Sequence, residues 1–265
     1  MKILTLNPVD TTVKIGDKPQ DLAPNVFDDC LLESDGECVG LFLRQAPEQL
    51  TKLLNIANKE FRSTRVPKMI MNRSSAITKA YKEHGTHRSS DTVQQYSTIL
   101  GSVAPRPHMR RPYPSTSSVH RKATAKPFVK CMLLAAREAA SLMEQHIPDV
   151  YHRQQQKIAE TPAKWRFGNL WTSSINNFNI AAAYHRDTKN VVGCVNVIMT
   201  KRNGSSGGNL HVPKYDAVFD QCDNSVLIYP AYRDVHGVTP IHTSHTEGYR
   251  NSFVLYPLGG FEKYK

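Results

Sequence analysis

Seven short segments with strand character lie in the last hundred residues of the chain, and turn-forming stretches such as "KRNGSSGGN" and "QCDN" separate them. Many short strands at this spacing are typical of a β-sandwich or a β-barrel. The expected strands are 164–172, 174–180, 191–200, 209–212, 225–229, 236–242 and 250–255.

The region before these strands has a different texture. "MKILTLNPV" and "CVGLFLRQ" read as strands, and "APEQLTKLLNIANKEFRST" carries an apolar helical face. A shorter helix is expected near 74–83. The strongest helix is 127–146, which opens on a proline and carries an apolar stripe, and a further helix is expected through Ala159. Helices packed on one face of a strand-rich core make this an α+β fold.

The charge of the chain is strongly positive and unevenly placed. The formal net charge is +11, and no Asp or Glu occurs between Thr92 and Arg137. The same region includes 101–127, a proline-, serine- and base-rich stretch that reads as a long loop or arm. A polyanionic partner, above all nucleic acid, is the natural interpretation, although a loop that only keeps the protein soluble has the same composition. The bases expected to contact such a nucleic-acid partner are Arg106, Arg110, Arg111, Arg121 and Lys122.

The sequence contains no apolar run long enough to cross a bilayer, and its N-terminus lacks the long apolar stretch of a signal peptide. Its five cysteines form no CxxC pair, which argues against a zinc ribbon or a disulfide framework. We therefore expect a soluble cytoplasmic protein, in the host cytoplasm if a phage encodes it.

Three residues form a candidate metal site. His185 and Asp187 are two apart, so both point to one face if the segment is extended. His236 follows in "DVHGVTP" and is preferred over His242 and His245 because a glycine and then a proline follow it. Two histidines and one carboxylate form the facial triad of non-haem iron(II), which leaves coordination positions open for a 2-oxo acid and dioxygen. A surface pair of His185 and Asp187 is the alternative.

Arg250 and Ser252 lie two apart at the start of an apolar strand and so share one of its faces. The remote carboxylate of a 2-oxo acid needs a cationic fork, which arginine supplies, with a second bond from a hydroxyl group. The alternative is that Arg250 is a structural partner in a salt bridge.

At this point the sequence resembles the iron(II)/2-oxoglutarate-dependent dioxygenases. His185-x-Asp187, the distal His236 and Arg250-x-Ser252 stand in that family's order, and "GGNLHVP" resembles its Gly-Gly-x-Leu-x-x-Pro hairpin. The resemblance implies a double-stranded β-helix (a jelly-roll or cupin-like core) with helices on one face and an N-terminal cover. The expected layout is one catalytic domain, 1–265. It comprises a cover at 1–125 with a basic loop at about 92–130, supporting helices at 126–160 and the core at 161–265.

Within that family, "NNFNIAAAYHRDTKN", "DVHGVTPI" and "YRNSFVLY" look like the TET/J-binding-protein branch, and especially its minimal bacteriophage members. That branch oxidises the 5-methyl group of pyrimidines in DNA. An asparagine-rich strand precedes the His-x-Asp motif in it, so the resemblance implies that Asn177 or Asn179 faces the co-substrate. In sequence terms either asparagine could equally cap a strand end.

The resemblance therefore implies an enzyme that binds iron(II) through His185, Asp187 and His236 and binds 2-oxoglutarate through Arg250 and Ser252. With dioxygen it would form succinate and hydroxylate the methyl group of a thymine or 5-methylcytosine flipped out of DNA. Three alternatives stay open. They are an oxygenase with another substrate (a protein side chain, a free nucleotide or an N-methylated base), a non-catalytic DNA-binding relative, and a hydrolase or cupin with the same metal ligands.

Overall fold

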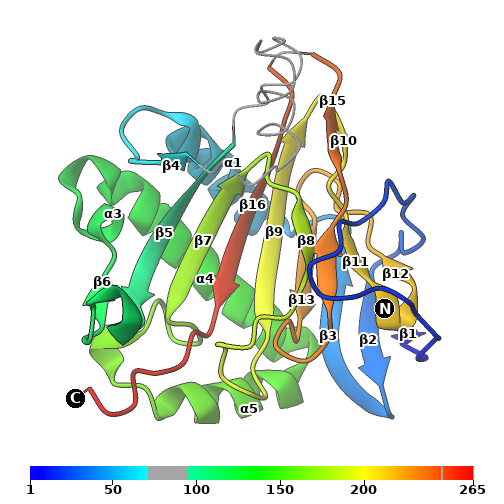
Figure 1. The fold of residues 1–265 in the computed structure, drawn as a ribbon, viewed down its shortest axis with the longest axis horizontal. Coiled ribbons are helices and arrows are strands. Elements are labelled where there is room, and N and C mark those ends of the chain that lie inside the picture. Colours follow the sequence, from blue (N-terminus) through cyan, green and yellow to red (C-terminus); the bar gives the residue numbers. More distant parts are fainter. Residues whose placement is uncertain (71–94, 246, 265) are drawn as a thin grey trace.

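A ten-stranded sheet spans the molecule in the computed structural model, which describes residues 1–70, 95–245 and 247–264 (Figure 1). Apart from the parallel pair at one edge, its neighbouring strands are antiparallel. In spatial order they are β1 (Lys2–Thr5), β2 (Cys30–Ser34), β3 (Glu37–Leu43), β13 (Val226–Tyr229), β9 (Asn196–Asn203), β16 (Tyr249–Tyr256), β7 (Ser173–Phe178), β5 (Tyr96–Val103) and β4 (Met69–Ile70), with β6 (Ser115–Thr116) beside β5.

A smaller sheet lies across one face of the large one. It consists of β12 (Ala217–Val218), β11 (Leu210–Val212), β14 (His236–Val238) and β8 (Ala182–His185), in that order. A two-stranded ribbon of β10 (Ser205–Gly207) and β15 (Ile241–Thr243) extends from one end. Two facing antiparallel sheets confirm the predicted double-stranded β-helix.

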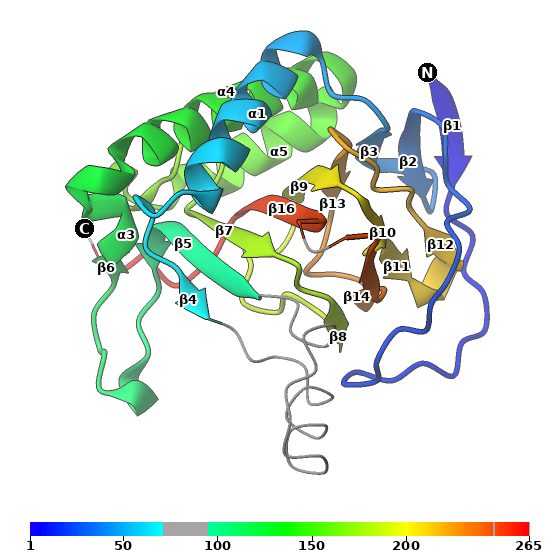
Figure 2. The ribbon, with the colours of Figure 1, turned by 90° about the horizontal axis from the view of Figure 1, so that it is seen from above.

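The helices cover the opposite face of the large sheet, as Figure 2 shows. The α-helices are α1 (Glu48–Arg62), α3 (Ser118–Arg121), α4 (Lys126–His146) and α5 (Pro148–Ala159). Short 3-10 turns are η1 (Pro107–Met109), η2 (Ala123–Ala125), η3 (Ala163–Trp165) and η4 (Pro213–Tyr215). The positions of α1, α4 and α5 confirm the helices expected from periodicity. The helix expected near 74–83 lies outside the described residues.

Aromatic side chains join the helices to the large sheet. Phe61 of α1 stacks on Phe128 of α4 with ring centroids 5.7 Å apart, and it meets Phe253 of β16 edge-on at 5.8 Å. All three side chains are fully buried, and burying each contributes roughly 1.5–3 kcal/mol. This packing fixes β16, one of the strands that form the site, from behind.

Three of the seven predicted core strands need correction. Segment 164–172 is η3 followed by a tight turn, because Gly168 takes a positive φ of 65° and Phe167 bridges back to Trp171. Segment 191–200 becomes regular strand only at Asn196, after a turn at Gly193. Segment 236–242 is two strands, β14 and β15, which belong to different sheets and are separated by Thr239 and Pro240.

Several strands were not predicted from the sequence. β2 and β5 are strands of the large sheet, and the four-residue β8 carries a metal-ligand candidate. The stretch read as a loop at 101–127 in fact begins with the last residues of β5 and includes β6 and α3. The division of the chain at residue 125 stays a prediction. The structure adds that β2, β3 and β5, which precede it, all pair within the large sheet.

Within the described ranges, no helix is both long and apolar enough to cross a membrane. The five cysteines, which all lie in these ranges, are free thiols.

Candidate active site

A pocket of about 610 Å³ opens between the two sheets. The large sheet contributes side chains from β5, β7, β9 and β16, and the small sheet contributes side chains from β8, β11 and β14. The pocket therefore has two walls, one on each sheet. Strands that face each other across a double-stranded β-helix can aim side chains at a common point, and the candidate residues gather here.

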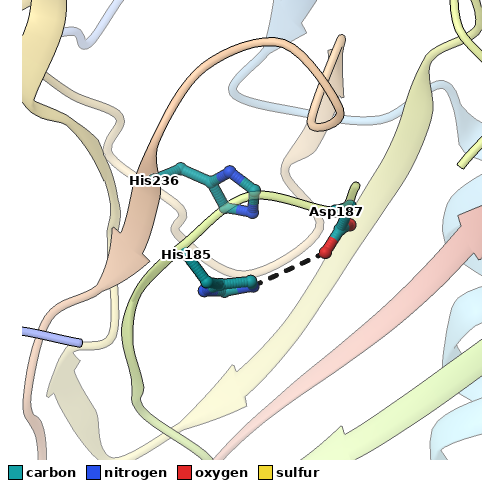
Figure 3. Close-up of side chains that lie close together, drawn as sticks. All are labelled: His185, Asp187 and His236. Carbon is teal, nitrogen blue, oxygen red and sulfur yellow. Dashed lines mark ion pairs between the residues drawn. The ribbon is translucent and has the colours of Figure 1, made fainter. Parts of the chain in front are cut away.

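His185 and Asp187 are the first two residues of a candidate metal-binding site, the metal cluster, on the small-sheet wall. His185 is the last residue of β8, and Asp187 follows in the loop. The Nε2 atom of His185 lies 3.6 Å from Oδ1 of Asp187 (Figure 3). Nδ1 of His185 is 2.7 Å from the carbonyl oxygen of Ala183. Because that carbonyl can only accept a hydrogen bond, Nδ1 carries the proton and Nε2 keeps its lone pair for a ligand.

His236 completes the cluster from the neighbouring strand. β14 pairs with β8 so that His236 lies directly opposite His185, and their ring centroids are 4.4 Å apart. Its Nδ1 donates to the carbonyl oxygen of Asp234 at 3.1 Å, which again leaves Nε2 free. Burial, followed by the charge of His185, lowers the pKa of His236 and so favours the neutral, ligating form.

The potential ligand atoms of His185, Asp187 and His236 all lie within 4.8 Å of one another. The rival His242 instead lies 2.8 Å from Asp21 at the surface. Within the described residues, these three side chains are the only group of His, Cys, Asp and Glu that meets this geometry.

Two buried asparagines orient the carboxylate of Asp187, and sequence reasoning missed both. Asn196 at the start of β9 donates from Nδ2 to Oδ2 of Asp187 at 2.8 Å. Asn190 donates to Oδ1 of Asn196, also at 2.8 Å, and so fixes which way that amide points. The second carboxylate oxygen, Oδ1, is the one that lies near His185. No sequence motif announces these contacts, because asparagine before an apolar strand is a common strand-end residue.

Arg250 lies on the opposite wall, in the middle of the large sheet. Its side chain is only 2% exposed, and among the described residues no carboxylate pairs with it. Burial, followed by the charge of Arg202 on the neighbouring strand, lowers the pKa of Arg250 to about 9. One guanidinium nitrogen donates to Oε1 of Gln221 at 2.9 Å, whereas the buried Nε has no acceptor within the described chain.

The "GGNLHVP" hairpin creates the space for Arg250. Gly208 has a positive φ of 65°, and a Cβ placed there would lie 3.1 Å from Cδ of Arg250. At Gly207 a Cβ would overlap the carbonyl oxygen of Pro240 at 2.0 Å. Both positions therefore require glycine, for conformation and for close approach.

The remaining candidates for co-substrate binding separate into two groups. Ser252 and Asn177 line the pocket and are direct partners in the pairing of β16 with β7. Asn179 takes a positive φ of 53° and lies outside the pocket lining. Its Oδ1 accepts from the backbone N–H of Arg250 at 2.7 Å, so in this structure it holds the start of β16 in place.

The basic residues predicted to contact DNA also differ in whether they line the pocket. Arg106 lines the pocket. Arg110 and Arg111 are exposed on the turn between β5 and β6, and Arg121 and Lys122 are exposed at α3. Two bases that were not predicted, Arg186 and Lys189, line the pocket beside the metal cluster. Arg186 is the middle residue of the His-x-Asp motif and Lys189 follows it by two residues, so their position in the sequence was a usable signal.

The residues fit the groups that the motif implies. Two imidazoles whose Nδ1 atoms bond to backbone carbonyls, and one carboxylate held by Asn196, suit iron(II) with open coordination positions. On the other wall, a buried cation with an unpartnered N–H suits the carboxylate of a 2-oxo acid. The two walls of one pocket thus provide both sets of contacts.

Comparisons with known proteins agree with this chemistry. The sequence model of the Tet/JBP family, described as the oxygenase domain of the 2OGFeDO superfamily, matches residues 104–258. Among solved structures, NgTET1 in complex with 5mC DNA matches with a TM-score of 0.62 at 14% identity, covering 96% of this chain and 85% of that chain. That match shows a shared fold.

Two other structures match at lower TM-scores. A bsmA homolog from Methylobium petroleophilum PM1 has a TM-score of 0.42 at 13% identity and covers 92% of this chain and 98% of its own. An oxidoreductase of the 2OG-Fe(II) oxygenase family from Burkholderia pseudomallei has a TM-score of 0.38 at 13% identity, with 77% and 89% covered. No curated protein matches the sequence. The match to the Tet/JBP model spans more than half of this chain. The chain therefore belongs to the Tet/JBP family of iron(II)- and 2-oxoglutarate-dependent oxygenases.

Proposed function

We propose that this oxygenase hydroxylates the 5-methyl group of a pyrimidine, 5-methylcytosine or thymine, in DNA. The observation that carries the proposal is the cationic rim of the pocket. Arg106, Arg186 and Lys189 line the pocket that holds the metal cluster, and Asp187 is the only carboxylate among its described lining residues. A pocket with this charge favours a polyanionic substrate. The shared fold with NgTET1, which is bound to 5mC DNA, supports the same substrate class.

The residues of the pocket have distinct roles in this proposal. His185, Asp187 and His236 hold iron(II), while Arg250 and Ser252 hold the distal carboxylate of 2-oxoglutarate and Asn177 lies beside them. When bound, these cofactors and dioxygen supply the oxidising power that inserts oxygen into a C–H bond, with succinate and carbon dioxide as co-products. The protein positions the methyl group over the metal and limits the access of water.

A methyl group on a paired base lies in the major groove, beyond the reach of a metal between two sheets. The base must therefore rotate out of the helix, which costs a few kcal/mol. A pocket of about 610 Å³ is within the range of sites that enclose small ligands, roughly 300–1,000 Å³. Arg186 and Lys189 are exposed beside the cluster, so they are suited to hold the phosphates that flank the extruded base.

The test is a reconstitution with iron(II) and 2-oxoglutarate, followed by exposure to air with duplex DNA that contains either thymine alone or added 5-methylcytosine. Digested nucleosides are analysed by mass spectrometry, and succinate is measured in the same samples. A gain of one oxygen on one of the two pyrimidines, absent with the His185→Ala variant, is the expected result. Succinate formed without any modified nucleoside would retain the oxygenase and reject DNA as its substrate.

A further inference from the structure

Gln221 is a fully buried side chain of the pocket with no role in the scheme above. It lies in the loop between β12 and β13, is 0% exposed and lines the pocket together with Arg250 and Ser252. Its backbone N–H donates to the carbonyl oxygen of Phe219, which follows β12, and to Oδ1 of Asn209, which precedes β11. These bonds hold the loop against the ends of two strands of the small sheet. Gln221 therefore connects the two walls close to Arg250.

The orientation of the Gln221 amide is fixed by its partners. Oε1 lies 3.0 Å from the backbone nitrogen of Leu210 and 2.9 Å from a guanidinium nitrogen of Arg250. Both partners can only donate, so the atom between them must be the oxygen. The amide NH₂ group consequently points away from both of them. Its nitrogen, Nε2, is buried and has no acceptor within the described residues.

A second buried donor lies on the residue that Gln221 contacts. Nε of Arg250 is also buried without an acceptor in the described chain. Native proteins leave few buried polar groups unpaired, because desolvation without a hydrogen bond is unfavourable. Two such donors, on side chains joined by a hydrogen bond and lining one pocket, indicate that an anion with several acceptor atoms belongs beside them.

We propose that Gln221 donates a hydrogen bond from Nε2 to the distal carboxylate of 2-oxoglutarate, next to the donors of Arg250 and Ser252. The carboxylate has two oxygens and accepts from several donors at once, so it satisfies the N–H groups that the protein leaves unpaired. Gln221 is thus a co-substrate-binding residue, and it strengthens the selection of a 2-oxo acid that carries a second carboxylate. This inference rests on the enzyme class and on the pocket, and it is independent of which substrate is hydroxylated.

The competing explanation is that Gln221 only holds Arg250 and Leu210 in place. A double-mutant cycle separates the two roles. Gln221→Met conserves volume and removes the amide, and it is combined with Arg250→Lys, which keeps the charge and changes the contact. Dissociation constants for 2-oxoglutarate are measured by calorimetry on all four proteins loaded with manganese(II). 2-Oxovalerate, which has the same chain length but no distal carboxylate, serves as the control ligand.

If Gln221 binds the carboxylate directly, Gln221→Met weakens 2-oxoglutarate binding about tenfold or more in both backgrounds. Binding of 2-oxovalerate changes less than twofold, which shows that the metal side of the pocket is intact. If Gln221 acts only through Arg250, the loss seen with Arg250 present disappears in the Arg250→Lys background. That result, or unchanged 2-oxoglutarate affinity in Gln221→Met, would overturn the proposal.

A measurement on the unaltered side chain covers the case in which Gln221→Met folds poorly. The zinc(II)-loaded protein is labelled with ¹⁵N, and the side-chain amide signal of Gln221 is assigned by its absence in Gln221→Glu, which retains an acceptor for Leu210. On addition of 2-oxoglutarate, direct bonding shifts this NH₂ signal and slows its exchange with water. 2-Oxovalerate leaves it largely unchanged. An NH₂ signal that responds equally to both ligands would contradict the proposal.

Discussion

The two walls of the pocket hold their functional side chains in contrasting ways. On the small-sheet wall, β8 is four residues long, and the side chains of His185 and Asp187 are 42% and 31% exposed. On the large-sheet wall, β16 is eight residues long and pairs on both sides, and Arg250 is 2% exposed. Two of the three metal ligands, His185 and Asp187, are therefore open to solvent on a short strand and its loop, whereas His236 and the co-substrate contact Arg250 are buried.

The N-terminal segment supports β8 and the small sheet. β8 is an edge strand of the small sheet, and edge strands have unpaired backbone groups. The N-terminal segment pairs with this edge: Gly16 N–H donates to the carbonyl of Tyr184 at 2.8 Å, and Tyr184 N–H donates to the carbonyl of Asp17 at 2.9 Å. The same segment bonds to the other side of the sheet, from Asn25 to Val218. We call residues 7–26 the N-terminal strap, because they hold both edges of the sheet that carries the histidines.

The contrast predicts that replacing Arg250 weakens 2-oxoglutarate binding without lowering the stability of the fold. Arg250→Met removes a buried cation that has no carboxylate partner, so we expect the unfolding midpoint to stay level or rise. The affinity for 2-oxoglutarate should fall at least about 100-fold, because a charge-assisted contact is lost. Calorimetry and thermal melts measure the two effects. A large fall in the midpoint with unchanged affinity would make Arg250 a structural residue.

Among the residues that support the metal ligands, the largest effect should come from Asn196, which reaches Asp187 from β9 of the large sheet. Asn196→Ala removes the bond that orients Asp187, and such supporting bonds typically contribute about 10–100-fold to metal affinity. Competitive titration with a metal-sensitive dye gives the affinity for manganese(II). The matched control is Asn176→Ala, which removes a buried asparagine of β7 that does not line the pocket. Equal losses in both variants would show a general effect of damaging the core.

The difference between the walls also governs what the sequence could predict. Arg250 and Ser252 are found because alternation along β16 puts residues two apart on one face. The same spacing identifies His185 and Asp187, although Asp187 lies in the loop that follows β8. Gln221 and Asn196 have no such local pattern. Their roles depend on contacts with Arg250 and Asp187 that arise after the sheets form.

Short strands were also hard to predict from the sequence. β8 is too short to show a periodic pattern, although it carries His185. Segment 236–242 has continuous strand character in sequence, but its two halves pair with different partners, β14 with β8 and β11, and β15 with β10. Pairing partners are a property of the whole fold, so residue patterns gave the strands' approximate positions without their breaks.

The expected contribution of the exposed basic residues to DNA binding depends on whether they line the pocket. Arg186→Gln with Lys189→Gln removes two cations beside the metal cluster, and we expect about tenfold weaker DNA binding at moderate salt. The slope of log affinity against log salt should become shallower by about 2. Arg110→Gln with Arg111→Gln is the comparison, since these residues are exposed but do not line the pocket. Fluorescence anisotropy at several salt concentrations distinguishes the pairs, and a larger effect from Arg110 and Arg111 would move the contact to the turn between β5 and β6.

The N-terminal strap should matter more for the metal wall than for Arg250. Gly16→Pro removes the N–H that bonds to Tyr184 and is incompatible with the φ of 97° at this position. We expect a loss of about 1–3 kcal/mol in unfolding free energy and a several-fold loss of manganese(II) affinity. Gly16→Ala keeps the N–H and isolates the strain. Metal affinity that is unchanged in Gly16→Pro would show that β8 holds its shape without the strap.

The smallest expected effect concerns pH and the small sheet. Burial lowers the pKa of His211 on β11, whose Nδ1 lies 2.6 Å from the hydroxyl of Tyr184 beneath the strap. Because the folded pKa lies below the unfolded value, the unfolded chain takes up the proton first as the pH falls. The stability contribution is therefore fully present above about pH 6.5 and is lost as the pH falls through the folded pKa. His211→Asn cannot titrate, so its unfolding free energy should decline less between pH 7 and pH 5 than that of the unaltered protein. The exposed His242→Asn is the control, and equal declines in the unaltered protein and His211→Asn would show that acid acts on the fold through other groups.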